Sequence, residues 1–156
     1  MKHSQFMLEA IRLSRVHMIK GDGGPFGAVV VKNGRIVGRG WNQVTSTNDP
    51  TAHAEVIAIR DACKKLKSYD LSEAVIYTSC EPCPMCLAAI YWARVGKIYY
   101  GNSRKDAAKI QFDDDFLYKE ISKPLLKRKV PILQLHRKQA LTSFKLWVEK
   151  LDKLSY

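Results

Sequence analysis

The chain has 156 residues, of which 46% are hydrophobic and 26% charged, an ordinary balance for one globular domain with a real core. Its net charge of +11 allows a nucleic-acid partner, but residues 119–156 hold ten Lys/Arg against three Asp/Glu, or +7, spread among apolar residues as on a solvated helix face. There is no apolar run long enough to span a membrane, no recognisable signal peptide and no disulfide framework among the four cysteines. We therefore expect a single domain over residues 1–156, in a reducing cytoplasm.

The first 42 residues predict a helix followed by a hairpin. Apolar residues recur near the 3.6-residue period over residues 3–20, and the glycine-rich stretch 21–25 ends that helix. Phe26–Val31 and Ile36–Trp41 are expected as strands, joined by a two-residue turn at Asn33-Gly34. Asn42 follows the second strand. It is either an ordinary turn residue or a ligand-binding amide.

The remaining elements predict an α/β fold. We expect helices over residues 52–66, after Pro82 or Pro84 as far as Ala93, and over Leu141–Leu154. The strands expected between them are Ala74–Ser79, Lys97–Tyr100 and, as a fifth strand, Val130–Leu135. Strand–helix–strand units with polar residues at the strand ends indicate a three-layer α/β/α sandwich whose site lies at the carboxyl edge of the sheet.

Two motifs on this scaffold carry the chemistry. His53-Ala54-Glu55 supplies an imidazole and a carboxylate, and Cys83-Pro84-Met85-Cys86 supplies two thiols behind Pro82. One His and two Cys suit zinc, and they leave its fourth tetrahedral position open for water. Glu55 is then close to the metal without being a ligand, so it is free to move protons. This combination, H-x-E with P-C-x-x-C, is the signature of the zinc nucleobase deaminases.

Other interpretations of the same residues explain less of the pattern. A redox Cys-x-x-Cys pair leaves His53-Ala54-Glu55 unexplained. A closed structural zinc site could recruit Cys80 as a fourth ligand, but it leaves Glu55 with no role. His53 and Glu55 are expected in the first turn of their helix. Two helix N-termini would then point at one metal.

The whole chain resembles the bacterial guanine deaminases of the cytidine-deaminase superfamily. The segments that carry the resemblance are Gly24-Pro25-Phe26-Gly27-Ala28, Asn42, Asn48 to Glu55, Thr78 to Cys86, Ala89 to Arg94, Phe112-Asp113-Asp114 and Tyr156. The resemblance implies a five-stranded mixed sheet and a homodimer that exchanges its C-terminal segments. It implies one zinc per chain on His53, Cys83 and Cys86, with Glu55 as the catalytic proton carrier. It also implies a purine held by Asn42, the Ala54 backbone N–H and Asp114, flanked by Phe26 and Trp92 and closed in by Tyr156.

The expected reaction is hydrolytic deamination of guanine to xanthine and ammonia. The main alternative is a tRNA adenosine deaminase with the same zinc site; the basic charge favours it, and the acidic triplet Asp113-Asp114-Asp115 opposes it. A zinc-stabilised binding module without turnover is the third possibility. Phe26 and Trp92 could also be core residues, and Tyr156 a frayed end.

Overall fold

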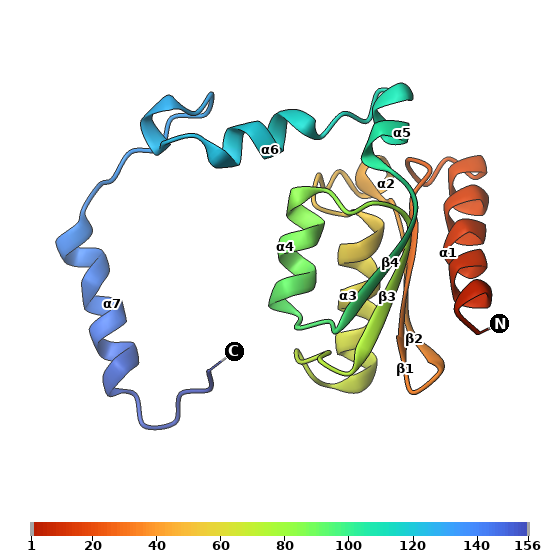
Figure 1. The fold of residues 1–156 in the computed structure, drawn as a ribbon. Coiled ribbons are helices and arrows are strands. Elements are labelled where there is room, and N and C mark those ends of the chain that lie inside the picture. Colours follow the sequence, from red (N-terminus) through yellow and green to blue (C-terminus); the bar gives the residue numbers. More distant parts are fainter. Residues whose placement is uncertain (1, 156) are drawn as a thin grey trace. The chain divides into compact units, whose positions relative to one another are not determined.

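The structure is a computed structural model that describes residues 2–155, and its centre is a four-stranded mixed sheet (Figure 1). The strands are β1 (Gly27–Lys32), β2 (Arg35–Trp41), β3 (Ala74–Cys80) and β4 (Lys97–Asn102), in the order β2-β1-β3-β4. β1 is antiparallel to β2 and β3, and β3 is parallel to β4. Asn33 and Gly34 both have positive φ, 52° and 72°, as a type I′ hairpin turn requires, so the predicted turn is confirmed.

Helices cover both faces of this sheet, which confirms the predicted three layers (Figure 1). On one face, α1 (Lys2–Ile19) buries Ala10 and Leu13 against Val29 and Tyr77. On the other face, α3 (Ala54–Leu66) and α4 (Pro84–Trp92) enclose a second apolar cluster. Two short helices, α2 (Val44–Thr47) and α5 (Arg104–Lys109), lie in the connections. No helix in the described part of the chain is both long and apolar enough to cross a membrane.

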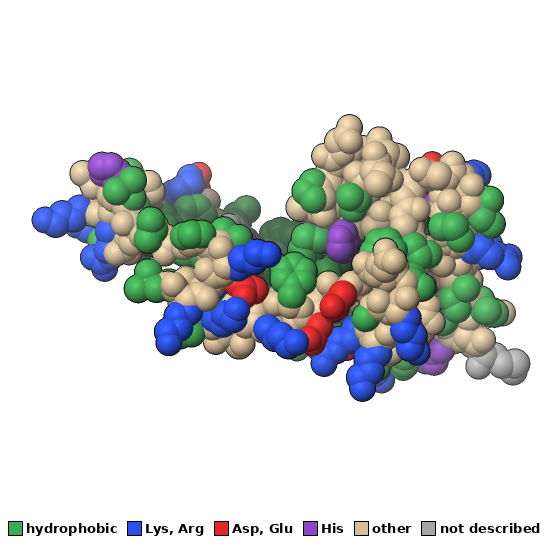
Figure 2. Space-filling view, turned by 90° about the horizontal axis from the view of Figure 1, so that it is seen from above, with side chains coloured by type: hydrophobic (Ala, Val, Ile, Leu, Met, Phe, Trp, Pro, Cys, Tyr) green, Lys and Arg blue, Asp and Glu red, His purple; other side chains and the backbone are tan. Residues whose placement is uncertain are grey.

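The carboxyl ends of β3 and β4 meet at one edge of the sheet, and α4 starts four residues after β3 ends there. The backbone N–H of Glu81 donates to the carbonyl of Asn102, 2.8 Å away, so the two strand ends stay joined. Figure 2 shows the molecule from above this edge, with a histidine side chain visible between hydrophobic side chains. The fold therefore brings a strand end and a helix start to the predicted place for a site.

The position of α3 is fixed by a very close approach to β2. A Cβ added to Gly38 would lie 2.2 Å from the carbonyl oxygen of Ala58, and one added to Gly40 would lie 2.1 Å from that of Ala54. Real Cβ atoms do not approach backbone this closely, so only glycine fits at either place. Ala54, at the start of α3, is therefore held against the end of β2 that leads to Asn42.

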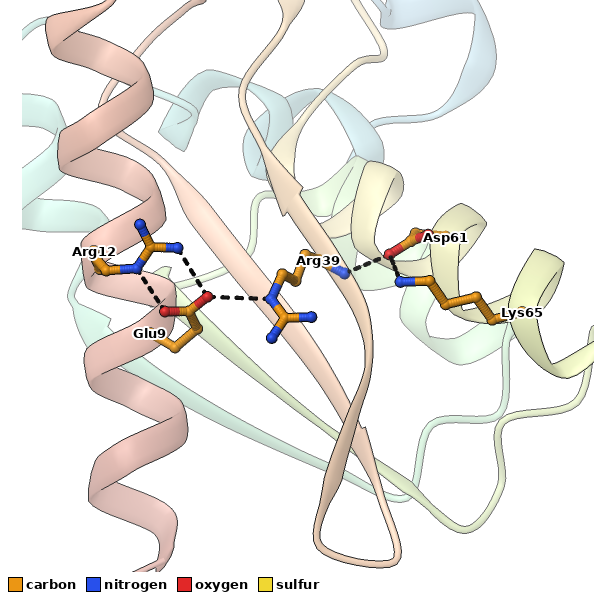
Figure 3. A network of polar contacts seen from close by, with 5 residues as sticks. All are labelled: Glu9, Arg12, Arg39, Asp61 and Lys65. Atoms are coloured by element: carbon orange, nitrogen blue, oxygen red, sulfur yellow. Dashed lines mark hydrogen bonds and ion pairs between the residues drawn. The ribbon is translucent and has the colours of Figure 1, made fainter.

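A polar network ties the same edge strand to the helices on both faces (Figure 3). The Arg39 guanidinium donates through Nε to Oε1 of Glu9 on α1, 3.1 Å away, and Arg12 donates to the same carboxylate. The Arg39 backbone N–H donates to Oδ2 of Asp61 on α3, 2.9 Å away, and Lys65 also donates to that oxygen. An edge-strand N–H that would otherwise face solvent is thereby paired.

The described residues form two compact units, one ending at Asp115 and the other beginning at Phe116. The elements after Asp114 are α6 (Asp115–Ser122), the 3₁₀ turn η1 (Leu125–Lys127) and α7 (Arg137–Glu149), and neither α6 nor α7 has a buried residue. The expectation of a single domain over residues 1–156 stays a prediction.

Two predictions for this second unit are wrong in detail. Residues 130–135 form no strand, because a strand needs a paired neighbour and the described residues provide none for this segment. The final helix runs over Arg137–Glu149 rather than Leu141–Leu154. The residues from Arg137 to Ala140 are good helix formers, which carries the helix back by one turn. Lys150 is extended and ends the helix, so Leu151 and Leu154 lie beyond it.

We expect Gly40→Ala to lower the free energy of unfolding by about 3 kcal/mol, because the new methyl meets the Ala54 carbonyl and must push α3 away. The same movement should weaken zinc binding, since α3 begins at the candidate metal ligand His53. Urea denaturation and zinc titration measure the two effects. Gly21→Ala is the control: it adds a methyl at positive φ into open space, so it should cost stability without changing zinc affinity. Equal zinc affinity in both variants would show that the close contact does not position the metal site.

Candidate active site

The three predicted metal ligands come together at the carboxyl edge of the sheet. His53 Nδ1 lies 3.6 Å from Cys83 Sγ and 3.5 Å from Cys86 Sγ. All three ligand atoms lie within 4.8 Å of one another, and they form the only such cluster of His, Cys, Asp and Glu among residues 2–155. Cys86 is buried and the other two are half-buried, so the cluster opens toward solvent on one side.

These distances fit zinc. With Zn–S of about 2.3 Å and Zn–N of about 2.0–2.1 Å, the N···S edge of a tetrahedral site is about 3.6 Å long. The observed 3.5 and 3.6 Å match that edge. Three protein ligands of this kind leave the fourth position for water or substrate, as in catalytic zinc sites.

His53 and Cys83 are both N-cap residues, of α3 and α4 respectively. Neither side chain caps its own helix, so each is free to bind a metal. Pro84 occupies the start of α4, which settles the choice between Pro82 and Pro84. The prediction that His53 lies inside the first turn is wrong by one residue, because helix α3 begins at Ala54. Both helix dipoles nevertheless point their positive ends at this cluster.

Of the three ligands, Cys83 alone favours the form that a metal needs before any metal binds. Hydrogen bonds from Cys86 and His53 lower the pKa of the Cys83 thiol to about 4, although its burial opposes this. The hydrogen bond to Cys83 raises the pKa of His53. Burial and the neighbouring Cys83 raise the pKa of Cys86, because two thiolates side by side repel each other. A divalent cation removes that repulsion and lets both sulfurs ionise.

Glu55 lies in the first turn of α3 and is 5% exposed. Its Oε1 accepts a hydrogen bond of 2.7 Å from the hydroxyl of Thr78, a fully buried residue near the end of β3. Burial raises the pKa of this carboxyl, and the Thr78 hydrogen bond opposes the shift. A carboxyl close to the metal ligands, with a raised pKa and one oxygen held, is suited to proton transfer.

Cys80 does not complete a four-ligand site. Its thiol points to the carbonyl of Ser103, 3.7 Å away, and it is not part of the ligand cluster. Burial raises the pKa of this thiol to about 11, so Cys80 stays neutral. The closed structural site therefore has no fourth ligand of this kind among the described residues.

Asn42 is buried, and its orientation is set by the backbone around it. Its Oδ1 accepts from the N–H of Gly24, 3.1 Å away, and from the N–H of Val44, 3.3 Å away. Because both partners are donors, the oxygen is the atom that faces them, and the amide NH₂ is left to donate elsewhere. Asn42 also donates its own N–H to the carbonyl of Phe26, 3.0 Å away.

The acidic triplet separates into two roles. Asp113 accepts the N–H of Asp115, 2.9 Å away, and so begins α6. Asp114 is half-buried and interacts with the charges of the metal cluster. Burial and the charge of Cys83 raise the pKa of Asp114. The charge of Asp114 in turn contributes to the raised pKa of His53. Asp114 is thus close enough to Cys83 and His53 for their charges to interact.

Phe26 packs against the core and also meets a second ring. Phe112 lies edge-on to it, with ring centroids 4.9 Å apart and planes at 86°. Phe112 is 46% exposed, so this aromatic pair is open to solvent on one side. An edge-on arrangement of this kind is one of the preferred geometries of an aromatic pair.

Of the remaining predicted site residues, Ala54 lies next to the ligand His53, and Trp92 lies far from the ligands. Ala54 is buried at the first position of α3, where a helix N–H has no partner within the helix. Trp92 is 70% exposed and ends α4, roughly 13 Å along the helix axis from Cys83. The structure therefore does not bring Trp92 to the ligands of its own chain. Tyr156 lies outside the described residues.

Thr78 and Phe112 lie within the sequence motifs, but the sequence alone predicts no role for either residue. The available signal for Thr78 was its place at the end of the strand that leads into the cysteine motif. Only the spacing between β3 and α3 shows that its hydroxyl meets Glu55.

Comparisons with known proteins agree with this geometry. Residues 1–102 match the family model of the cytidine and deoxycytidylate deaminase zinc-binding region. Guanine deaminase of Bacillus subtilis (strain 168) is 50% identical over 156 residues, which cover 100% of both chains. An X-ray structure of guanine deaminase from Bacillus subtilis matches with a TM-score of 0.97 over 100% of this chain and 99% of that chain, at 50% identity. A tRNA-specific adenosine deaminase of Buchnera aphidicola subsp. Schizaphis graminum is 44% identical over 88 residues, which cover 56% of this chain and 58% of that protein.

The matched region contains His53, Glu55, Cys83 and Cys86, and the structure gathers their side chains around a site with the dimensions of a zinc centre. The chain belongs to the cytidine and deoxycytidylate deaminase family of zinc proteins.

Proposed function

We propose that this chain hydrolyses guanine to xanthine and ammonia. The observation that carries the proposal is the extent of the likeness: similarity to a guanine deaminase runs through the entire length, including the segment of Phe112 and Asp114. The likeness to tRNA deaminases is less complete: one tRNA-specific adenosine deaminase is 40% identical over 67% of the chain, and a structure of a tRNA:A34 deaminase covers 84% of it at 34% identity.

The site residues have two separate tasks in the proposed reaction: three of them bind the metal, and Glu55 transfers protons. His53, Cys83 and Cys86 would hold a zinc ion, which would supply a water that is acidic enough to act as a nucleophile near neutral pH. Glu55 accepts the proton of that water as its oxygen attacks C2, and delivers it to the adjacent ring nitrogen. Glu55 then carries a second proton from the new hydroxyl to the amine, so that the C2–N bond breaks, ammonia leaves and C2 keeps a carbonyl oxygen.

Hydrogen bonds from the protein to the purine edge determine which base is accepted. Asp114 can accept from the N1–H and the amine of guanine, whereas adenine presents a bare N1 acceptor there. The NH₂ of Asn42 can donate to an acceptor on the purine edge, because its oxygen is occupied by Gly24 and Val44. The Ala54 N–H adds a second donor. The pair Phe26 and Phe112 offers ring faces and edges to the base.

The positive charge is the observation that favours RNA as an alternative substrate. On the face drawn in Figure 2, Lys and Arg side chains are scattered among other types. Asp114 places negative charge beside the cluster, where an RNA phosphate would be repelled.

The active form is a homodimer in this proposal. In α7, Phe144 and Val148 are 72% and 70% exposed, and apolar side chains exposed this widely indicate a surface that another chain covers. The segment 130–135 is mostly apolar and forms neither helix nor strand, and β4 has a second edge that pairs with no strand of the described residues. The C-terminal segment of one copy docks on the other, and Tyr156 closes the partner's site while Trp92 lies at the shared surface.

We place the protein in the cytoplasm. All four cysteines are free, and a site that needs two thiolates stays intact where thiols are kept reduced.

The metal and the proton carrier should be separable. Glu55→Gln keeps about one zinc per chain but should lose at least 10²–10⁴-fold in kcat, the usual contribution of general acid–base catalysis. Cys83→Ser should lose zinc and stability together. Cys63→Ser on α3 is the matched control, because Cys63 is outside the ligand cluster. Metal analysis and ammonia release measure the two effects. Normal turnover by Glu55→Gln, or loss of zinc in Cys80→Ser, would contradict these assignments.

Asp114→Ala should lower guanine turnover by about 10–100-fold while zinc is retained, because the N1–H and amine of guanine lose their acceptor. Asp113→Ala removes the same charge from the neighbouring residue and should keep the activity. Wild-type ammonia release should be high with guanine and absent with free adenine. Efficient deamination of a tRNA anticodon hairpin, weakening steeply with salt, would instead establish the tRNA alternative.

Exchange of the C-terminal segments can be tested by complementation. A chain lacking Leu154-Ser155-Tyr156 and a chain with Glu55→Gln should each be inactive alone. Refolded together in equal amounts, they should recover about a quarter of wild-type activity, because half of the dimers are mixed and each has one site with both Glu55 and a closing segment. If each segment served its own subunit, the mixture would stay inactive.

A further inference from the structure

We infer that Thr78 is a positioning residue for the reaction: it fixes the carboxylate of Glu55 so that one defined oxygen carries the proton. The inference rests on the proposed role of Glu55 in deamination. Its basis is the hydrogen bond of 2.7 Å from Thr78 Oγ1 to Glu55 Oε1, between two buried side chains.

The donor is held more rigidly than an average side chain. Thr78 belongs to β3, which has a neighbouring strand on each side, with Ala28 of β1 and Tyr100 of β4 as its partners. The residue is 0% exposed, so packing surrounds the side chain completely. A β-branched side chain in a strand has few χ1 options. The hydroxyl therefore provides a fixed point on the sheet for a carboxylate that comes from α3.

The reaction requires such a fixed point. Glu55 alternates between carboxylate and carboxylic acid, and the proton must sit on the oxygen that faces the reacting atoms. If Oε1 accepts from Thr78 in both states, Oε2 is left as the oxygen that gains and loses the proton. Without that hydrogen bond the carboxyl group can rotate about its last torsion, and a small misplacement of a proton donor has a large cost in rate.

A purely structural role for Thr78 predicts different measurements from a positioning role. Thr78→Val keeps the shape of the side chain and removes the hydroxyl. We expect kcat for guanine, per zinc-loaded folded site, to fall by about 10–100-fold, the usual range for a hydrogen bond to a charged group. KM should change less than threefold, and zinc content should remain near one per chain. Thr78→Ser restores the hydroxyl and should recover kcat to within about threefold of wild type.

The matched control is Ile76→Val, because Ile76 lies two residues earlier on the same face of β3 and is 0% exposed. This variant loses core packing without touching Glu55, so its kcat should be unchanged even though its thermal midpoint falls. If Thr78→Val has the wild-type kcat, or if Ile76→Val lowers kcat as much as Thr78→Val does, the inference is wrong. Should Thr78→Val not fold, Thr78→Ala answers the same question with the same measurements.

A double-mutant cycle provides a readout that does not depend on activity. Thr78→Val and Glu55→Ala, alone and combined, are compared by chemical denaturation of the zinc-loaded protein. The two changes together should cost less stability than the sum of the single changes, because each removes the same hydrogen bond. Strict additivity would overturn the contact. Absence of guanine turnover in the wild type would instead overturn the proposed function, and the double-mutant cycle would still measure the contact between Thr78 and Glu55.

Discussion

The convergence of two helix starts on one point at the sheet edge is the constraint on which the rest of the structure depends. Each helix begins directly after a candidate metal ligand, His53 for α3 and Cys83 for α4. This arrangement needs α3 to lie almost on the backbone of β2, and the glycines Gly38 and Gly40 permit it. The position of α3, and with it that of His53, thus depends on small residues in the sheet beneath it.

The electrostatics of the site are organised around an expected cation. Cys83 and Cys86 repel each other when ionised, and burial opposes the charge of Glu55 and Asp114. Four acidic groups of this kind are costly in one partly buried place unless a positive ion compensates them. Helix dipoles contribute part of that compensation, and zinc supplies the rest. Of the basic residues, Arg104 acts on this balance, because its charge favours the carboxylate of Asp114.

The two units of the chain contribute different parts of the proposed enzyme. Residues up to Asp115 contain the sheet, the ligands and the groups proposed to select the base. The unit from Phe116 onward keeps its apolar residues exposed in α6 and α7, so its own elements do not bury a core. In the proposed dimer a second copy supplies the missing cover. The same association would bring in the closing residue that the sheet-bearing unit lacks, which couples assembly to activity.

The sequence by itself determined the metal chemistry, the layer architecture and most of the helices and strands. His53, Glu55, Cys83 and Cys86 could be read directly, because ligand chemistry depends on residue type and on spacing along one or two helix starts. The turn at Asn33-Gly34 was equally local, since it depends on two residues that tolerate positive φ. Only the tertiary structure decided that Thr78 meets Glu55, that Asn42 turns its NH₂ away from Gly24, and that Trp92 lies far from the ligands of its own chain. These facts depend on how far apart a strand and a helix lie and on which end of a helix faces the metal. The strand predicted at 130–135 is absent because strand formation also depends on the tertiary structure. The apolar pattern of this segment is suited to a strand, but a strand forms only where another strand offers free backbone groups to pair with.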